Sequence, residues 1–497
     1  MGDHRGDQPP ESRSLGPLHA PAGKPEGVFS KEETVLRAGR SYCPGCFEKQ
    51  GKIDQLLEEN ERLRQKLRYE ERKAQEGFFG SSTPPSKIPI KGNQTGERKP
   101  KGAKPGHRGA GRKGFAESEA DQVVQVPPEL DTACPHCGGS LEDKGVEERL
   151  VIDSEPLQAR RLFYRLPKKY CPRCRKLFPS RAPGVLPRSL YGNQLITTAT
   201  VMHYLHGIPM GRVCEQLGIG PGSLVEMFHR LSRLWEKVPA QLIERYRHSP
   251  VKHADETGWR TEGKNGYAWL FATPKLSIFL FRKSRSAEVP KGVFGPGPLP
   301  GVLVVDRYAG YNQAPCAIQY CYAHLLREVQ ELEKEFPDSG EVQAFVSTLA
   351  PLLSLAMGLR NQPLSASRFR SEALKVKAQI ISAVNRPARQ LGIRHIQEIF
   401  RQNANRLYLW AEDRAIPAEN NLAERDLRPT VIARKTSFGS QSDAGAHTRG
   451  VLMTVLYSLK KQGVDVAAHL KNVLDQLAKD IHQDPFPLLF PRDGPTS

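Results

Sequence analysis

Two stretches in the second half of the chain decide the fold: SPVKHADETGWRTEGKNGYAWLFATPKLSIFLFR at 249–282 and GVLVVDRYAGY at 301–311. The first predicts a short strand leading to Asp255, then strands at YAWLFAT and LSIFLFR with a turn at Pro274-Lys275. The second predicts a buried strand that ends at Asp306 and a glycine-containing turn. Carboxylates at the strand ends of an α/β sheet face an open crevice where ligands bind.

A third carboxylate follows in IPAENNLAERDLRPTVIARK at 416–435. If this stretch is helical, Asn421, Glu424 and Arg428 share one face. Two strand acids and one helix acid supply hard oxygen ligands for a pair of Mg²⁺ or Mn²⁺ ions, which can drive phosphodiester chemistry. Each acid alone also fits a structural role, Asp255 or Asp306 in a turn and Glu424 in an ion pair with Arg428. Their order along the chain favours the metal interpretation.

Six of the nine cysteines form three Cys-x-x-Cys pairs. Cys134, Cys137, Cys171 and Cys174 predict a structural Zn²⁺ site, because four thiolates leave no open coordination position. The 33-residue spacer contains the alternating segments ERLVIDS and RRLFYRL, which predict a β-hairpin between the two pairs. The pair Cys43 and Cys46 is half a ligand set. It either completes a site across a dimer or is two plain thiols, and we slightly favour the thiols.

The N-terminal part combines low-hydrophobicity segments with one strongly helical stretch, KIDQLLEENERLRQKLRYEERKA. Its seven-residue spacing predicts a short parallel coiled coil with a buried asparagine, although a helix packed on its own chain fits as well. The seam residues are Ile53, Leu56, Asn60, Leu63, Leu67 and Ala74. The following linker, KGNQTGERKPKGAKPGHRGAGRKG, carries eight Lys or Arg and one acid. We expect it to contact phosphates rather than bases, with a solvated linker as the alternative. The linker cations named for this role are Arg98, Lys99, Lys101, Lys104 and Arg108.

The stretch IPMGRVCEQLGIGPGSLVEMFHRL predicts two helices joined by a turn at Leu217-Gly218-Ile219, with Ser223 as a cap of the second helix. A helix-turn-helix that enters a DNA groove and an ordinary helical hairpin fit this pattern equally well. In the first case, His229 and Arg230 of the second helix are exposed and set the preference for particular DNA ends.

The composition favours a nucleic-acid partner. The formal net charge is +19, from 73 Lys and Arg against 54 Asp and Glu. We see no apolar segment typical of a secretory signal or of a membrane span, and no membrane partner is expected. The Cys-x-x-Cys pairs are typical of a reducing compartment, hence a cytoplasmic location.

The ordered set of motifs resembles the transposases of the insertion sequence 66 family, from about residue 50 to 480. The motifs are the coiled coil, PGHRG, the cysteine knuckle, YLHGIPMGR, HADETGW, DRYAGY, CYAHLLREV and ENNLAERDLRP. Three features depart from the family pattern. Glu419-Asn420-Asn421 stands for Asp-Asn-Asn, Cys321-Tyr322-Ala323-His324 stands for Cys-Trp-Ala-His, and the Cys43 pair lies outside the pattern. The first departure leaves Glu419 as a competitor of Glu424 for the third ligand, with Glu424 preferred.

The resemblance implies an α/β fold with a ribonuclease-H-like core, in which Asp255, Asp306 and Glu424 are the catalytic and metal-binding triad. By this resemblance Asp255 and Asp306 bind both metal ions and Glu424 binds one. The enzyme would cleave element ends and join the freed 3′ hydroxyl to target DNA. His324, Arg327 and Arg428 are candidate phosphate contacts, with packing roles as the alternative. Trp259 is interpreted as a core aromatic rather than a base-stacking residue.

The predicted segments are 1–39 (disordered), 40–75 (Cys pair and coiled coil), 76–122 (basic flexible linker), 123–188 (zinc ribbon), 189–247 (helix-turn-helix-like), 248–320 (first part of the core), 321–410 (helical insertion), 411–462 (second part of the core) and 463–497 (C-terminal helix and tail). A nuclease without strand transfer and a non-catalytic DNA-binding regulator are the competing functions. We expect a homodimer or higher oligomer and a nucleoid-associated prokaryotic protein. The sequence leaves open whether accessory proteins of the same element take part.

Overall fold

A computed structural model describes residues 48–49, 51–60, 63–64, 117–119, 123, 159–173 and 175–491. The chain divides into two units, Met1–Tyr69 and Glu70–Ser497. The predicted disordered N-terminus, the Cys43 and Cys46 pair, the linker cations from Arg98 to Arg108, and Cys134, Cys137 and Cys174 lie outside the described residues.

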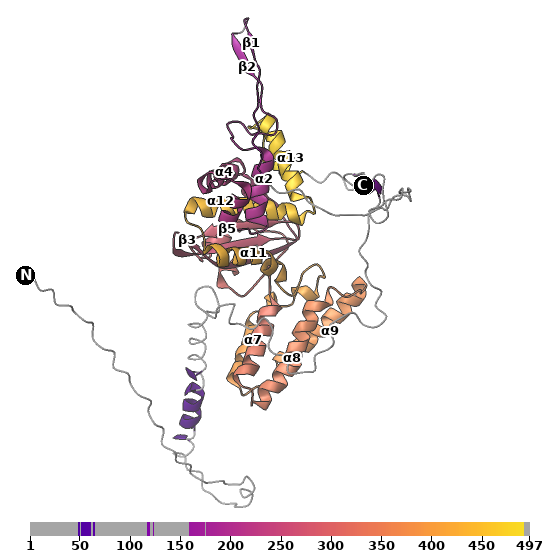
Figure 1. Cartoon of the computed structure of the whole chain (residues 1–497). Helices are drawn as coiled ribbons and strands as arrows, with labels where there is room; N and C mark the ends of the chain where they lie inside the picture. Colours follow the sequence, from indigo (N-terminus) through magenta and orange to yellow (C-terminus); the bar gives the residue numbers. More distant parts are fainter. Residues whose placement is uncertain are drawn as a thin grey trace, which may run out of the picture. The chain divides into compact units, whose positions relative to one another are not determined.

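In the first unit, every described residue between 48 and 64 is helical (Figure 1). The helix prediction for this stretch is therefore confirmed for those residues. Ile53, Leu56 and Leu63 of the predicted seam expose about half of their surface or more. A coiled-coil partner for this face stays a prediction.

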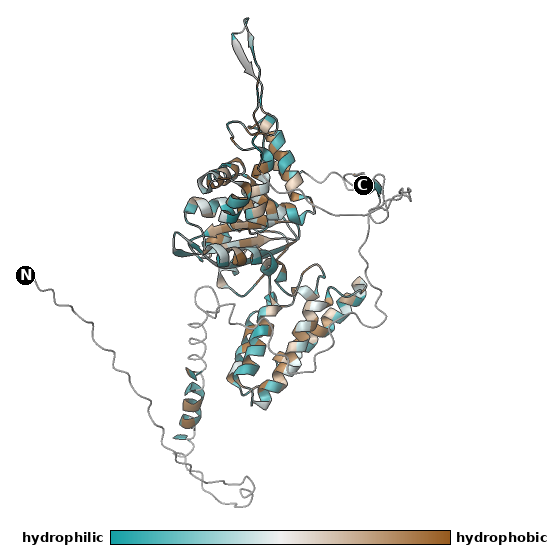
Figure 2. Cartoon of the chain, in the orientation of Figure 1, coloured by the Kyte–Doolittle hydropathy of each residue, from teal (hydrophilic) through white to brown (hydrophobic). Residues whose placement is uncertain are grey.

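The second unit is a mixed α/β structure built on a five-stranded sheet of order β5-β4-β3-β6-β7 (Figure 1). β3 (Val251–Thr261), β4 (Lys264–Ala272) and β5 (Ser277–Arg282) form an antiparallel meander, and β6 (Val302–Val305) and β7 (Ala317–Tyr320) continue the sheet as parallel strands. The predicted turn at Pro274-Lys275 and the predicted strand Val302–Val305 are confirmed. Figure 2 colours part of this sheet brown, in keeping with the buried apolar side chains of β4, β5 and β6.

The outer edge of β5 is covered by α12 (Asp443–Lys461), which presents hydroxyl groups to the free backbone of the strand. The Thr454 hydroxyl accepts from the Phe279 amide at 2.9 Å, and the Ser458 hydroxyl accepts from the Ser277 amide at 3.1 Å. Unpaired edge groups would otherwise be open to pairing with another chain. α11 (Asn421–Ser437) packs against β3 and β4 and brings its N-terminal end to the sheet.

Helices precede the sheet: α2 (Asn193–Thr200), a π-helical turn (Val201–Leu205), α3 (Met210–Leu217), α4 (Pro221–Leu234) and α5 (Val238–Arg247). The turn prediction is confirmed, because Gly218 ends α3 in the left-handed conformation with φ 62°. Three details were wrong. Ser223 lies inside α4, which begins at Pro221 after Gly220. His229 contacts the Thr448 hydroxyl at 2.6 Å, and Arg230 donates to the carbonyl groups of Pro187 and Arg188. Both side chains therefore bind their own chain. His229 does so because α4 packs against α12, and Arg230 does so at the segment that precedes α2.

A run of helices separates β7 from α11: α7 (Tyr322–Glu335), α8 (Gly340–Leu359), α9 (Ala366–Val384) and α10 (Leu391–Gln402), followed by the short turns Ala404–Arg406 and Leu409–Ala411. α8 is long and apolar enough to cross a membrane by length and composition alone, which the sequence prediction did not anticipate. It packs between α7 and α9, with Val342, Leu349 and Leu353 fully buried (Figure 1). The helix therefore buries one face in this layer, and 39% of its apolar 18-residue window is buried in all.

Smaller elements complete the described chain. β1 (Lys168–Cys171) pairs with β2 (Lys176–Pro179) as an antiparallel hairpin, and Cys171 is the last residue of β1. The segment Arg160–Leu166, predicted as a strand, is not in a strand. The remaining elements are a turn at Glu117–Glu119, α6 (Glu288–Phe294), a turn at Ala309–Tyr311, α13 (Val466–Lys479) and α14 (Pro485–Leu489).

Candidate active site

Asp255 and Asp306 lie on neighbouring parallel strands. The last paired residues of β3 and β6 are His253 and Val304, and each aspartate follows two residues later. Because parallel strands keep their register, the two carboxylates come to the same place at the end of the β3–β6 pairing. Asp306 ends its strand as predicted. Asp255 was predicted at a strand end but lies mid-strand, because β3 continues to Thr261 in its pairing with β4.

The pKa of Asp255 is influenced by burial and by the charges of other acids. Burial raises the pKa of Asp255 well above its ordinary value. The carboxylates of Glu256, Asp306 and Glu424 raise this pKa further, whereas the backbone amide of Glu256, which donates to Asp255 at 2.8 Å, lowers it. Like charges that gather in a buried place disfavour ionisation, and a bound cation reverses that effect.

Glu256 is a further buried acid that the sequence analysis missed. Its side chain is only 2% exposed, and Arg285 donates to it at 2.7 Å while the Tyr311 hydroxyl donates at 2.6 Å. Burial and then Asp306 raise the pKa of Glu256, and the bonds from Tyr311 and Arg285 oppose them. The two donors thus satisfy this buried carboxylate. The only sequence signal was the Asp-Glu doublet inside a strand.

Asn420 positions the start of α11, and hence Glu424, against β3. Its buried side chain bonds His253 Nδ1 at 2.9 Å and donates to the Ala254 carbonyl at 2.8 Å. Its backbone amide donates to the Cys321 Sγ at 3.1 Å. Burial lowers the pKa of His253 to about 4, so this imidazole is neutral and its Nδ1–H donates to Asn420. These contacts join a strand, the start of α7 and the start of α11 at one residue.

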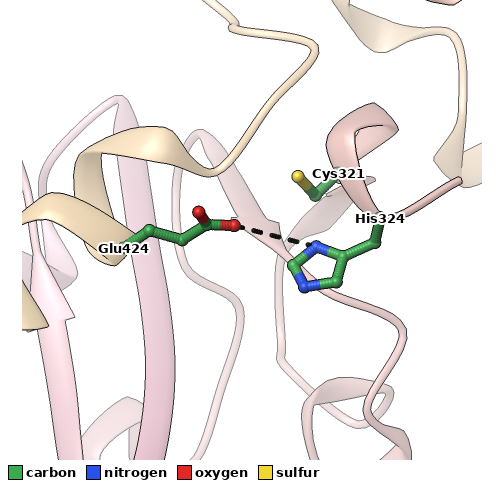
Figure 3. Close-up of side chains that lie close together, drawn as sticks. All are labelled: Cys321, His324 and Glu424. Carbon is green, nitrogen blue, oxygen red and sulfur yellow. Dashed lines mark ion pairs between the residues drawn. The ribbon is translucent and has the colours of Figure 1, made fainter. Parts of the chain in front are cut away.

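Glu424 lies in the first turn of α11, as the predicted helix requires. Its Oε1 faces His324 Nδ1 at 4.0 Å, and the Cys321 thiol lies beside them (Figure 3). Both facing atoms are shielded from solvent and have no hydrogen-bond partner among the described residues. The pairing of Glu424 with Arg428, the alternative considered from the sequence, is replaced by this contact with α7.

A groove of about 1630 Å³ begins at Glu424 and does not include Asp255, Asp306 or His324. Asn421 and Arg428 line it together with Glu424, as their shared helix face predicts. Its wall is mostly basic, with Arg245, Lys275, Arg360, Arg425, Arg428 and Lys461 against the acids Glu419 and Glu424.

The competing third acid, Glu419, has different neighbours. Burial raises the pKa of Glu419, and the charges of Arg360 and Arg425 lower it. Neither aspartate is among the causes of this shift. Of the two glutamates, only Glu424 is among the charges that shift the pKa of Asp255.

The remaining predicted site residues are Arg327, Trp259 and the four cysteines expected to bind zinc. Arg327 is exposed on α7 one turn after His324. Trp259 is a core aromatic as predicted, 1% exposed, with its ring 5.0 Å from that of Phe281 and its Nε1 donating to Ser440. The side chains of all four predicted zinc ligands are outside the description, and only the backbone of Cys171 is described.

Comparisons with known proteins match two parts of the chain to one family. The family model described as "Transposase IS66 family" matches residues 188–448, more than half of the chain. The model described as "zinc-finger binding domain of transposase IS66" matches residues 131–175, which contain all four cysteines predicted to bind zinc. Two uncharacterized proteins of Sinorhizobium fredii are similar along most of their length. y4qI is 26% identical, and the match covers 76% of this chain and 76% of y4qI. y4jD is 23% identical, and the match covers 71% of this chain and 76% of y4jD. The chain belongs to the IS66 family of transposases.

Proposed function

We propose that this transposase cleaves the ends of its element and joins the freed 3′ hydroxyl to target DNA at a centre formed by Asp255, Asp306 and Glu424. Family membership implies a protein that binds and processes DNA. The observation that carries the proposal is the parallel register of β3 and β6, which brings Asp255 and Asp306 to the same end of their pairing. Glu424 of α11 is among the charges that raise the pKa of Asp255. The order of the sheet, an antiparallel meander continued by two parallel strands, supports a ribonuclease-H-like core.

The acids fit a pair of divalent metal ions. Hard carboxylate oxygens are the ligands that Mg²⁺ and Mn²⁺ prefer, and the unpartnered Oε1 of Glu424 is available as one. When bound, such ions would activate the attacking oxygen and stabilise the leaving one. The chain's own part is to hold the acids in place. Asn420 fixes the start of α11, and Arg285 and Tyr311 hold Glu256 behind Asp255.

The basic groove beside Glu424 supports a path for a DNA strand that enters the site. Arg428 and Arg425 are exposed on α11, and Arg360 reaches the same groove from the end of α8. Arginine side chains on such a wall bind phosphates without reading bases. His324 and Arg327, one turn apart on α7, remain candidates for phosphate contacts on the other side of Glu424.

Two further parts of the proposal concern segments outside the active centre. The match of the zinc-finger model supports a structural Zn²⁺ held by Cys134, Cys137, Cys171 and Cys174. The exposed apolar face of the helix around Leu56 supports self-association through a coiled coil. A nuclease without strand transfer is the second candidate, and only an assay for joined product separates the two.

The test is a metal-dependent strand-transfer assay with DNA that carries the element's ends. Asp255→Asn, Asp306→Asn and Glu424→Gln should each reduce both cleavage and joining by more than the roughly 10- to 100-fold that loss of an outer-shell partner costs. Binding of the same DNA should change little. Glu419→Gln is the matched control and should retain most activity.

Two outcomes would refute parts of this assignment. Loss of activity in Glu419→Gln, with activity retained in Glu424→Gln, would show that the third acid is misassigned. Cleavage without any joined product would favour the nuclease.

A further inference from the structure

The starts of α7 and α11 bring together three metal-ligand types that an all-oxygen magnesium site does not use. Cys321 Sγ, a His324 ring nitrogen and a Glu424 carboxylate oxygen all lie within 4.8 Å of one another. Figure 3 shows the imidazole and the carboxylate pointing toward each other, with the thiol at their side. Cys321 and His324 share one turn of α7, so two of the three ligands come from a single rigid element.

The surroundings favour a bound cation. His324 Nδ1 and Glu424 Oε1 are shielded from solvent, and neither has a hydrogen-bond partner in the described part of the chain. Buried polar atoms without partners cost free energy, and an ion placed between them would satisfy both. The Asn420 amide donates to Cys321 Sγ at 3.1 Å, a bond that also stabilises a thiolate bound to a metal. The amide of Tyr322 donates to the Ala418 carbonyl at 2.8 Å and keeps the two helix starts together.

The spacing suits a tetrahedral ion. Bonds of about 2.0 to 2.3 Å place tetrahedral ligand atoms roughly 3.3 to 3.8 Å apart. The three atoms lie within 4.8 Å of one another and must therefore approach by about 1.5 Å at most. His324 and Glu424 are each about one third exposed, at 31% and 32%, so their side chains have room to rotate. Thiolate, imidazole and carboxylate together select Zn²⁺ over Mg²⁺.

We propose that Cys321, His324 and Glu424 form a second, regulatory Zn²⁺ site, which excludes the catalytic ions by taking Glu424 away from them. Binding of zinc does not depend on the proposed function, whereas the inhibition rests on it. The shared carboxylate is the connection, because Glu424 is also among the charges that act on Asp255. Free zinc would thus hold the enzyme in an inactive state.

The binding test uses the full-length protein with its zinc-finger cysteines already loaded with zinc, titrated with Co²⁺ alone. The wild type should bind one additional Co²⁺ per chain, with the absorption band of a thiolate–cobalt bond. Cys321→Ser should lose the band, and His324→Ala should weaken Co²⁺ binding by more than about tenfold. Cys316→Ser is the matched control, a cysteine of intermediate exposure outside the cluster, and should keep the band. His324→Ala also covers the case in which Cys321→Ser fails to fold.

The inhibition test adds Zn²⁺ to the magnesium-dependent strand-transfer reaction, with each variant compared with its own rate without zinc. Zinc should inhibit the wild type and Cys316→Ser, and more Mg²⁺ should be needed to restore the rate. Cys321→Ser should need at least about tenfold more zinc for the same inhibition. A wild type without the cobalt band, or a band that survives in both Cys321→Ser and His324→Ala, would overturn the site. If the wild type shows the cobalt band and is active, but zinc does not inhibit it, the idea that zinc takes Glu424 away from the catalytic ions is overturned. If the wild type shows the cobalt band but has no strand-transfer activity, the result counts against the proposed function alone.

Discussion

Removal of the Asn420 side chain should both destabilise the sheet unit and impair catalysis. In Asn420→Ala, the His253 Nδ1–H and the Ala254 carbonyl lose their partners, while both remain inside the protein. Each buried polar group left without a partner costs about 1 to 3 kcal/mol. The expected loss of unfolding free energy is therefore about 2 to 6 kcal/mol.

The assay is urea unfolding at neutral pH, followed by the fluorescence of the buried tryptophans, of which Trp259 and Trp269 lie in the sheet. Asn421→Ala is the control. It removes the same side chain from the adjacent, exposed position, and its effect should stay within about 0.5 kcal/mol. The strand-transfer rate of Asn420→Ala should fall by about a hundredfold even where the protein is folded, because a shift of about 1 Å in Glu424 has this cost.

An unfolding free energy within about 0.5 kcal/mol of the wild type would refute the argument, since it would mean that His253 and Ala254 find other partners. A folded Asn420→Ala variant with full activity would refute its second half. In that case Glu424 would be held in place by the rest of α11, where Arg434 donates to the Gly258 carbonyl at 2.7 Å.

Four further predictions follow from other parts of the chain. Burial and the charge of Arg449 lower the pKa of His203 to about 4. Since this lies below the unfolded value of about 6.5, His203 alone should lower the unfolding free energy by about 2 kcal/mol between about pH 7 and pH 5. In urea unfolding, His203→Asn should lose that much less than the wild type over this range, while the loss due to His253 remains. Metal analysis should find about one zinc per chain under conditions that leave the regulatory site empty, and Cys171→Ser should lose it together with the stability of its domain. Leu63→Pro should shift the full-length protein toward monomer in sedimentation, because proline breaks the helix of the predicted coil. Neutralising the linker cations should weaken binding of element ends and random DNA alike and reduce the salt slope by roughly one per lost contact, the cations being Arg98, Lys99, Lys101 and Lys104.

Features encoded by local pattern were predictable from the sequence. The strand Val302–Val305 is a short apolar run between turn residues, and the shared face of Asn421, Glu424 and Arg428 follows from their spacing once the stretch is helical. The length of β3 was not predictable, because its continuation past Asp255 depends on pairing with β4 as far as Thr261. Which face of α4 packs against the rest of the chain was not predictable either. His229 is turned inward by Thr448, which lies 219 residues later in the chain.

The difference between local pattern and distant contacts also separates the acids of the site from the residues that hold them in place. An acid at a strand end or on a helix face has a local signature, whereas a supporting residue is defined by partners far away in the sequence. Asn420 meets His253 across 167 residues and Cys321 across 99. Because these contacts converge on one buried residue, the position of Glu424 depends on the partners of Asn420. A change at Asn420 therefore reaches the catalytic acids through the backbone of α11, and a change at Cys321 reaches them through Asn420.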